Sequence, residues 1–168
     1  FKMVEYVCAR GGQLKIETNG HFLTPENCER LKDLEVKAVQ VSLDGATRST
    51  FNRMRVRGSF DVATDGVRNL RAAGVPIEVN YSPTCFNVHE IGTAIDLAYE
   101  LGAYSFYTGR TMYTGNAVKA WHKLELSDER TLRSFERLEA RHARRHDDEI
   151  EAREIRFGLR HELEPQRP

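Results

Sequence analysis

Short polar side chains follow four apolar segments of the sequence, at the point where each segment ends. The members of these four groups are Thr18 and Asn19, Ser42 and Asp44, Asn80 and Ser82, and Thr108. Hydroxyl and amide groups of this kind suit a ligand rich in hydroxyls and amines, such as a ribose or an amino acid. The alternative is that these residues only shape turns, because Asn-Gly and Asp-Gly pairs commonly start loops.

The segments that precede these groups have the pattern of β-strands separated by helices. Strands are predicted at residues 14–18, 38–43, 77–82 and 104–108. Repeated strand–helix units at this spacing predict parallel strands joined by helical crossovers, in a (β/α) barrel or a doubly wound sheet. Ligands bind at the carboxyl ends of parallel strands, so the four polar groups are expected to line one rim.

The rest of the chain carries weaker local signals. Residues 46–58 are expected to form a polar connection, and Asn87 with Glu90 resembles a capping box at a helix start. A charged helix is predicted from residue 127 to about residue 145, followed by a last strand within residues 153–158. The side chains expected on the buried face of that helix are Leu132, Phe135 and Leu138.

Composition and charge exclude several functions. Lys and Arg together number 25, as do Asp and Glu, so there is no cationic surplus for general nucleic-acid binding. No apolar run is long enough to span a bilayer, and no export signal is visible. Cys8, Cys28 and Cys85 are too far apart for a local metal site or a disulfide framework. We therefore expect them to be buried apolar side chains in a reducing, cytoplasmic protein.

Three segments resemble those of one enzyme family. Residues 16–20 with Leu23-Thr24 are similar to the third barrel strand of radical SAM enzymes, and residues 39–45 resemble their fourth strand. Residues 51–61 resemble their arginine-containing loop and the Gly-Ser-Phe helix start after it. The resemblance covers about residues 5–125. It is strongest to the subgroup with a SPASM-type extension, which includes peptide-modifying maturases, sulfatase-activating enzymes and a heme-pathway branch.

This resemblance implies the fold and its division. The fold would be α/β, a fragment of a (β/α)6 TIM-like barrel with parallel strands and a charged C-terminal helix. Residues 1–125 would form the radical SAM partial-barrel core, and residues 126–168 a C-terminal helical extension.

The resemblance also implies how the rim would hold S-adenosylmethionine (SAM). Ser42 would lie near its methionine or ribose part, and Arg53 or Arg55 would pair with its carboxylate through a charge-assisted fork. Asn80 and Ser82 would face the ribose or adenine. The backbone near Tyr107 and Thr108 would face the adenine edge, and Thr18, Asn19 and Asp44 would complete the rim.

The sequence departs from the family pattern at the iron–sulfur cluster. The family's CxxxCxxC motif, its GGE-like motif and the SPASM cysteines are absent from this sequence. Three thiolates are needed to hold the [4Fe–4S] cluster and leave one iron for SAM, so its ligands would lie outside this chain. We expect the chain to be a fragment that begins in the helix before the third strand; a degenerate protein is the alternative.

The implied function is that of an enzyme, or part of one. In its complete form, a reduced [4Fe–4S] cluster would cleave SAM to a 5′-deoxyadenosyl radical that abstracts hydrogen from a peptide or small-molecule substrate. A different class of function stays open, namely a non-catalytic barrel module whose rim binds a nucleotide-like or peptide ligand.

Overall fold

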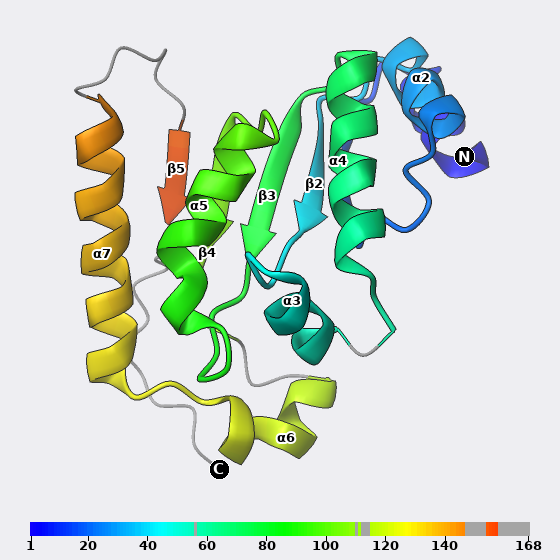
Figure 1. Ribbon diagram of the computed structural model, residues 1–168. Coiled ribbons are helices and arrows are strands. Elements are labelled where there is room, and N and C mark those ends of the chain that lie inside the picture. The colour runs from blue at the N-terminus through cyan, green and yellow to red at the C-terminus, as the bar shows by residue number, and fades with distance from the viewer. Residues whose placement is uncertain (56, 110, 112–114, 147–153, 158–168) are drawn as a thin grey trace.

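The computed structural model describes residues 1–55, 57–109, 111, 115–146 and 154–157. Helices and strands alternate along most of the chain (Figure 1). In order they are α1 (Lys2–Cys8), β1 (Lys15–Thr18), α2 (Pro25–Asp33), β2 (Ala38–Ser42), α3 (Arg48–Met54), α4 (Phe60–Ala73), β3 (Ile77–Tyr81), the 3-10 turn η1 (Val88–Glu90), α5 (Ile91–Glu100), β4 (Ser105–Thr108), α6 (Asn116–Leu124), α7 (Asp128–His146) and β5 (Glu154–Phe157).

The strands form one sheet in the order β1-β2-β3-β4-β5, and every neighbouring pair is parallel. This confirms the α/β class and the sequential, parallel order predicted for the first four strands. The last strand occupies residues 154–157 of the segment in which it was expected, while residues 153 and 158 lie outside the described residues.

Helices α4, α5 and α7 lie over the same face of the sheet (Figure 1). Alternate strand residues such as Val41, Val79 and Phe106 point to this face and are fully or almost fully buried. They pack in one core with α4 and α5, which contribute Val67 and Ile95 among others. Burial of this apolar stripe is the main stabilising contribution to the layer.

The intervening strand residues lie on the opposite face, and most of them are polar. In register, Glu17 pairs with Gln40, and Gln40 pairs with Glu78. Nearer the carboxyl edge, Ser42 pairs with Asn80. The sheet is therefore apolar toward its helices and polar on the other side.

Three helix ends carry residues that are typical helix caps. Thr24 accepts a hydrogen bond from the Asn27 amide at 3.2 Å and caps α2, with Pro25 in the first helical position. Ser59 caps α4 in the same way. Gly74 ends α4 with φ of 73°, a left-handed conformation that favours glycine.

Two local expectations are wrong. The connection over residues 46–58 contains the helix α3, which Thr47 caps and in which Phe51 is fully buried. A seven-residue helix with so few apolar residues has no periodic signal to detect. In addition, the side chains of Asn87 and Glu90 form no capping hydrogen bonds at η1 or α5.

The buried face of α7 also differs from the expectation. Leu138 is buried and Phe135 is half-buried, as predicted, but Leu132 is 61% exposed. At about 100° per residue, Leu132 lies roughly 120° around the helix from Leu138, whereas Ser134 shares the face that packs on α5. The domain boundary at residue 125 stays a prediction. Among the described residues, no helix is both long and apolar enough to cross a bilayer.

Candidate functional site

The carboxyl ends of the strands meet at one edge of the sheet, where α3 and α6 lie beyond the strand arrowheads (Figure 1). Ser42 and Asn80 are register partners on the polar face, and Asn80 also pairs with Tyr107 of β4. The structure therefore brings two of the predicted site residues together, with an aromatic ring in the same row. A hydroxyl, an amide and a phenol in this order can donate to and accept from a polar ligand.

Thr18 and Thr108 belong to the other face of the sheet. Thr18 pairs with the buried Val41, and Thr108 pairs with the buried Tyr81. The hydroxyl of Thr18 accepts from the Gly20 amide at 3.1 Å. The hydroxyl of Thr108 is buried and has no hydrogen-bond partner among the described residues. Their side chains are thus separated from the Ser42–Asn80 row, although their backbone lies at the same edge.

Asp44, Arg55 and Ser82 join the ends of β2 and β3. The Asp44 carboxylate is 5% exposed, and its Oδ2 accepts from Nε and Nη2 of Arg55 at 2.8 and 2.6 Å. Its Oδ1 accepts from the backbone amide of Ser82 at 2.9 Å. Asp44 therefore contacts two other predicted site residues, and the Arg55 guanidinium already has a carboxylate partner.

Arg53 has different surroundings from Arg55. Its guanidinium lies 4.3 Å from the centroid of the Phe86 ring, in cation–π geometry, and no carboxylate pairs with it among the described residues. A ligand carboxylate would find this cation uncompensated.

A hollow of about 450 Å³ opens beside β1 and includes both Asn19 and Arg55. Its other lining residues come from the loop after β1 and from the α3–α4 region, and they are His21, Phe51, Met54, Arg57, Gly58, Ser59 and Val62. Asn19 itself forms only a local contact, in which its Oδ1 accepts from the His21 amide at 3.0 Å. The hollow connects the β1 corner, which we define as Thr18, Asn19 and His21, to the predicted arginine loop.

Two residues that the sequence suggested as helix caps instead hold the loops of the edge together. Asn87 is fully buried, and its Nδ2 donates to the carbonyls of Asp44 and Ser82, each at 3.0 Å. Glu90 accepts hydrogen bonds from the loop that follows β2. We call the set Asp44, Arg55, Ser82, Asn87 and Glu90 the β2–β3 corner.

The polar face also holds an ion pair with a buried carboxylate, which was not predicted from the sequence. Glu78 is buried, pairs with Lys15 and accepts from the Tyr104 hydroxyl. The Lys15 ammonium lies 4.1 Å from the centroid of the Tyr107 ring. Burial alone would lower the pKa of Lys15, but the Glu78 carboxylate outweighs it and raises that pKa above its ordinary value. The alternation of Ile77-Glu78-Val79-Asn80 is the signal that could have predicted this face.

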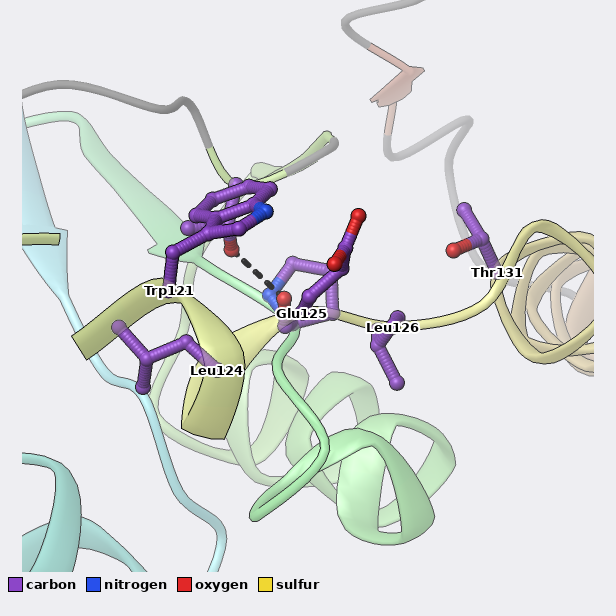
Figure 2. A pocket seen from close by; sticks show the side chains of 7 residues that line it. Trp121, Leu124, Glu125, Leu126 and Thr131 are labelled. Atoms are coloured by element: carbon purple, nitrogen blue, oxygen red, sulfur yellow. Dashed lines mark hydrogen bonds between the residues drawn. The ribbon is translucent and has the colours of Figure 1, made fainter. Parts of the chain in front are cut away.

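A second, much smaller space lies where α6 meets the loop after β3 (Figure 2). It measures about 10 Å³, which is enough for at most about one water molecule. The Thr111 hydroxyl donates to the Pro83 carbonyl at 2.7 Å, and the Cys85 amide donates to the Leu124 carbonyl at 3.2 Å. This region packs α6 against the edge and does not hold a ligand.

The cysteines do not form a cluster site. Cys28 is fully buried, and burial raises the pKa of its thiol to about 11. Cys8 and Cys85 are half-buried, and all three thiols are free. Within the described part of the chain, no group of three or more His, Cys, Asp or Glu side chains is placed to hold a metal ion. The thiolates of a [4Fe–4S] cluster therefore do not fit these positions.

Comparisons with known proteins identify a family and several relatives. The sequence profile of the radical SAM superfamily matches residues 1–98. An AdoMet-dependent heme synthase of Methanosarcina barkeri is 32% identical over 139 residues, which is 82% of this chain and 38% of that protein. The mycofactocin maturase MftC of Mycobacterium tuberculosis is also 32% identical over 82% of this chain and 35% of its own length. The chain thus spans well under half of these relatives.

The fold has a close counterpart among solved structures. Streptococcus suis SuiB bound to S-adenosylmethionine superposes with a TM-score of 0.72 at 13% identity, over 93% of this chain and 33% of SuiB. SuiB bound to its precursor peptide SuiA gives a TM-score of 0.71 over the same share of this chain. At this identity, the likeness shows a shared fold.

Proposed function

The chain belongs to the radical SAM superfamily, and we propose that it is the SAM-binding part of a longer enzyme that abstracts hydrogen from a peptide. The observation that carries the proposal is the register of Ser42 with Asn80. This pairing places a hydroxyl beside an amide at the carboxyl end of the sheet, on the face opposite α4, α5 and α7. Carboxyl ends of parallel strands are where such folds bind their ligands.

Four residues at the edge would contact SAM in this proposal. Ser42 and Asn80 would hydrogen-bond the hydroxyl and amino groups of SAM, and the neighbouring Tyr107 ring would border the adenine. We assign the methionine carboxylate to Arg53, because the charge of Arg55 is compensated by Asp44 at 2.6 Å. Asp44 and Ser82 would then support the site rather than contact SAM.

Bound to a reduced [4Fe–4S] cluster, SAM supplies the 5′-deoxyadenosyl group for hydrogen abstraction. The thiolates for that cluster would come from a part of the protein outside this chain, since Cys8, Cys28 and Cys85 do not fit. The contribution of this chain is to bind SAM, fix its orientation and limit water at the edge of the sheet.

A peptide is the substrate class that the relatives support best. One matched relative is a mycofactocin maturase, and one matched structure contains a precursor peptide. The heme synthase among the relatives shows that the superfamily match alone leaves room for a small molecule. The hollow of about 450 Å³ beside β1 is lined by His21, Arg55 and Arg57 among others, and it would give an extended substrate access to the edge.

Calorimetric titration of SAM into the complete protein tests this proposal. Ser42→Ala should weaken binding by about 1 kcal/mol, the contribution of one neutral hydrogen bond. Arg53→Ala should cost about 2–3 kcal/mol, because a charge-assisted contact is lost. Ser127→Ala also removes a serine hydroxyl, but at the start of α7, and it should leave the affinity for SAM unchanged. Equal affinities for all variants would refute the assigned site.

A further inference from the structure

We propose that Glu90 is a positioning residue for SAM: it holds the loop after β2, and with it the helix that carries the SAM-pairing arginine. This inference rests on the proposed function and assigns a role to a residue outside the predicted contacts. Glu90 lies at the end of η1, directly before α5. Its carboxylate binds the loop after β2, so its effect on SAM binding is transmitted by that loop.

The carboxylate of Glu90 accepts four hydrogen bonds from one short segment. Its Oε2 accepts from the backbone amides of Ala46 and Thr47 at 2.9 and 3.3 Å. Its Oε1 accepts from the hydroxyls of Thr47 and Thr50 at 2.8 and 2.7 Å. These donors are 40 to 44 residues away in sequence, so the contact joins two separate parts of the chain. Ending a single 3-10 turn does not require four hydrogen bonds to a distant part of the chain.

The environment of Glu90 favours its ionised form. Its side chain is only 13% exposed, and this burial would by itself raise the pKa of the carboxyl group. The four hydrogen bonds outweigh burial and hold the pKa below its ordinary value. His89 lies next to it, with Nε2 3.9 Å from Oε1. A carboxylate with this many donors fixes them strongly, because each bond is charge-assisted.

The segment held by Glu90 is the start of α3. Thr47 caps this helix by accepting from the Thr50 amide at 3.3 Å, and Glu90 binds both residues. Glu90 thus also places a negative charge at the amino end of the helix, where it is favourable. Arg53 lies in the last turn of the same helix, and Arg55 follows directly after it. Because α3 is only seven residues long, fixing its start fixes the position of both arginines.

The loop before α3 packs closely against that helix at Gly45. A Cβ atom on Gly45 would lie 2.4 Å from the Phe51 amide nitrogen and 2.8 Å from its Cα. Asn87 holds the preceding residue through its hydrogen bond to the Asp44 carbonyl at 3.0 Å. Asn87 therefore holds one end of this loop at Asp44, and Glu90 holds the other end at Ala46 and Thr47. Without the carboxylate, the amides of Ala46 and Thr47 would lose their acceptor.

The test compares Glu90→Gln and Glu90→Ala with two controls in the complete protein. Glu100→Gln makes the same chemical change at the exposed end of α5, and Leu138→Ala destabilises the core between α7 and α5 without removing a hydrogen bond to the loop. The measurements are SAM affinity by calorimetry, thermal unfolding, and hydrogen exchange at the Ala46 and Thr47 amides. Affinity is measured well below each unfolding midpoint.

We expect Glu90→Ala to weaken SAM binding by about tenfold, in line with losing a supporting residue of a site. Glu90→Gln should have a smaller effect of the same sign, since one amide oxygen remains as an acceptor. In both variants, the Ala46 and Thr47 amides should exchange faster. Leu138→Ala should lower the midpoint without changing affinity, and Glu100→Gln should change neither quantity.

Three results would overturn the inference. Unchanged affinity in both Glu90 variants, while the wild type binds SAM, would refute the positioning role and leave the proposed function intact. An equal loss of affinity in Leu138→Ala would mean that the Glu90 variants weaken binding only by destabilising the fold. A wild-type protein that binds no SAM would remove the proposed function itself, and the role of Glu90 with it.

Discussion

The β1 corner and the β2–β3 corner have similar polar sequences, but they are connected in different ways. In the β1 corner, Thr18 and Asn19 each accept from an amide only two residues away. In the β2–β3 corner, Asp44 bonds to Ser82 across 38 residues, and Glu90 bonds to Ala46 across 44. One corner shapes its own turn, whereas the other joins two strand–helix units.

This difference separates residues that are available to a ligand from residues that are committed to the fold. The charges of Asp44 and Arg55 compensate each other, and Asn87 uses its amide on two carbonyls. Ser42 and Asn80 lie side by side on the polar face, while Asn19 borders the hollow beside β1. Substitutions in the β2–β3 corner should therefore lower stability and act on binding only through the position of α3, whereas substitutions elsewhere on the edge should act mainly on binding.

The largest effect on stability is expected from Asp44→Ala. It removes a buried carboxylate that pairs with the half-buried Arg55 and accepts from the Ser82 amide, and it should lower the free energy of unfolding by about 3 kcal/mol. Denaturant unfolding provides the measurement. Asp65→Ala, which removes the exposed ion pair with Arg68, is the control and should cost at most about 1 kcal/mol. Similar losses in the two variants would contradict the view that the β2–β3 corner supports the fold.

Gly45→Ala should have the next largest effect. The added Cβ would clash with the backbone of Phe51, so the loop or α3 would have to move, at a cost of about 1–3 kcal/mol. Thermal unfolding of the variant would measure this cost. A change within about 0.5 kcal/mol would mean that the loop adapts easily and that the corner is less rigid than its contacts indicate.

Glu90→Gln should produce a smaller loss of stability that depends on pH. Because the pKa of Glu90 is lower in the folded state than its ordinary value, its contribution is present above that value. It is lost as the pH falls through the folded-state pKa. The difference in unfolding free energy between wild type and variant, about 1–2 kcal/mol at pH 7, should shrink below about pH 4. A difference independent of pH would argue against the ionised carboxylate.

The smallest effect on stability is expected in the β1 corner. Asn19→Ala removes a single exposed hydrogen bond to the next turn and should cost about 0.5–1 kcal/mol. Chemical unfolding and SAM titration of the same sample would separate its two possible roles. A loss above about 2 kcal/mol would show that this corner, too, supports the fold.

The strands and the shared edge were predictable because they depend on patterns of neighbouring residues. Apolar segments such as 77–82 and the glycine at position 74 carry their signal locally, and parallel pairing follows from their spacing. The polar face was predictable in principle, since Glu78 and Asn80 alternate with buried residues. The resemblance supplied the remaining step, from a polar edge to SAM.

The supporting contacts could not be predicted in the same way. Asn87 and Glu90 have the spacing of a capping box, but their side chains bind residues about 40 positions earlier. Only the folded sheet brings the side chains of Asn87 and Glu90 close to these partners. A buried tertiary hydrogen bond then forms in place of an exposed helix cap. Leu132 was placed wrongly for a related reason. Its apolar character suggests burial, but the packing of α7 on α5 selects a different face.

The strictly sequential order of the sheet has a consequence for how the chain folds. Each strand pairs with the one made just before it, and representative partners are 23, 38, 27 and 49 residues apart for Lys15–Ala38, Val39–Ile77, Glu78–Ser105 and Ser105–Glu154. A chain leaving the ribosome therefore always presents its newest strand with an edge that is already complete, so the layer can grow during synthesis. The last pairing uses the segment that is made last, so we expect β5 to be the final one of the described strands to join.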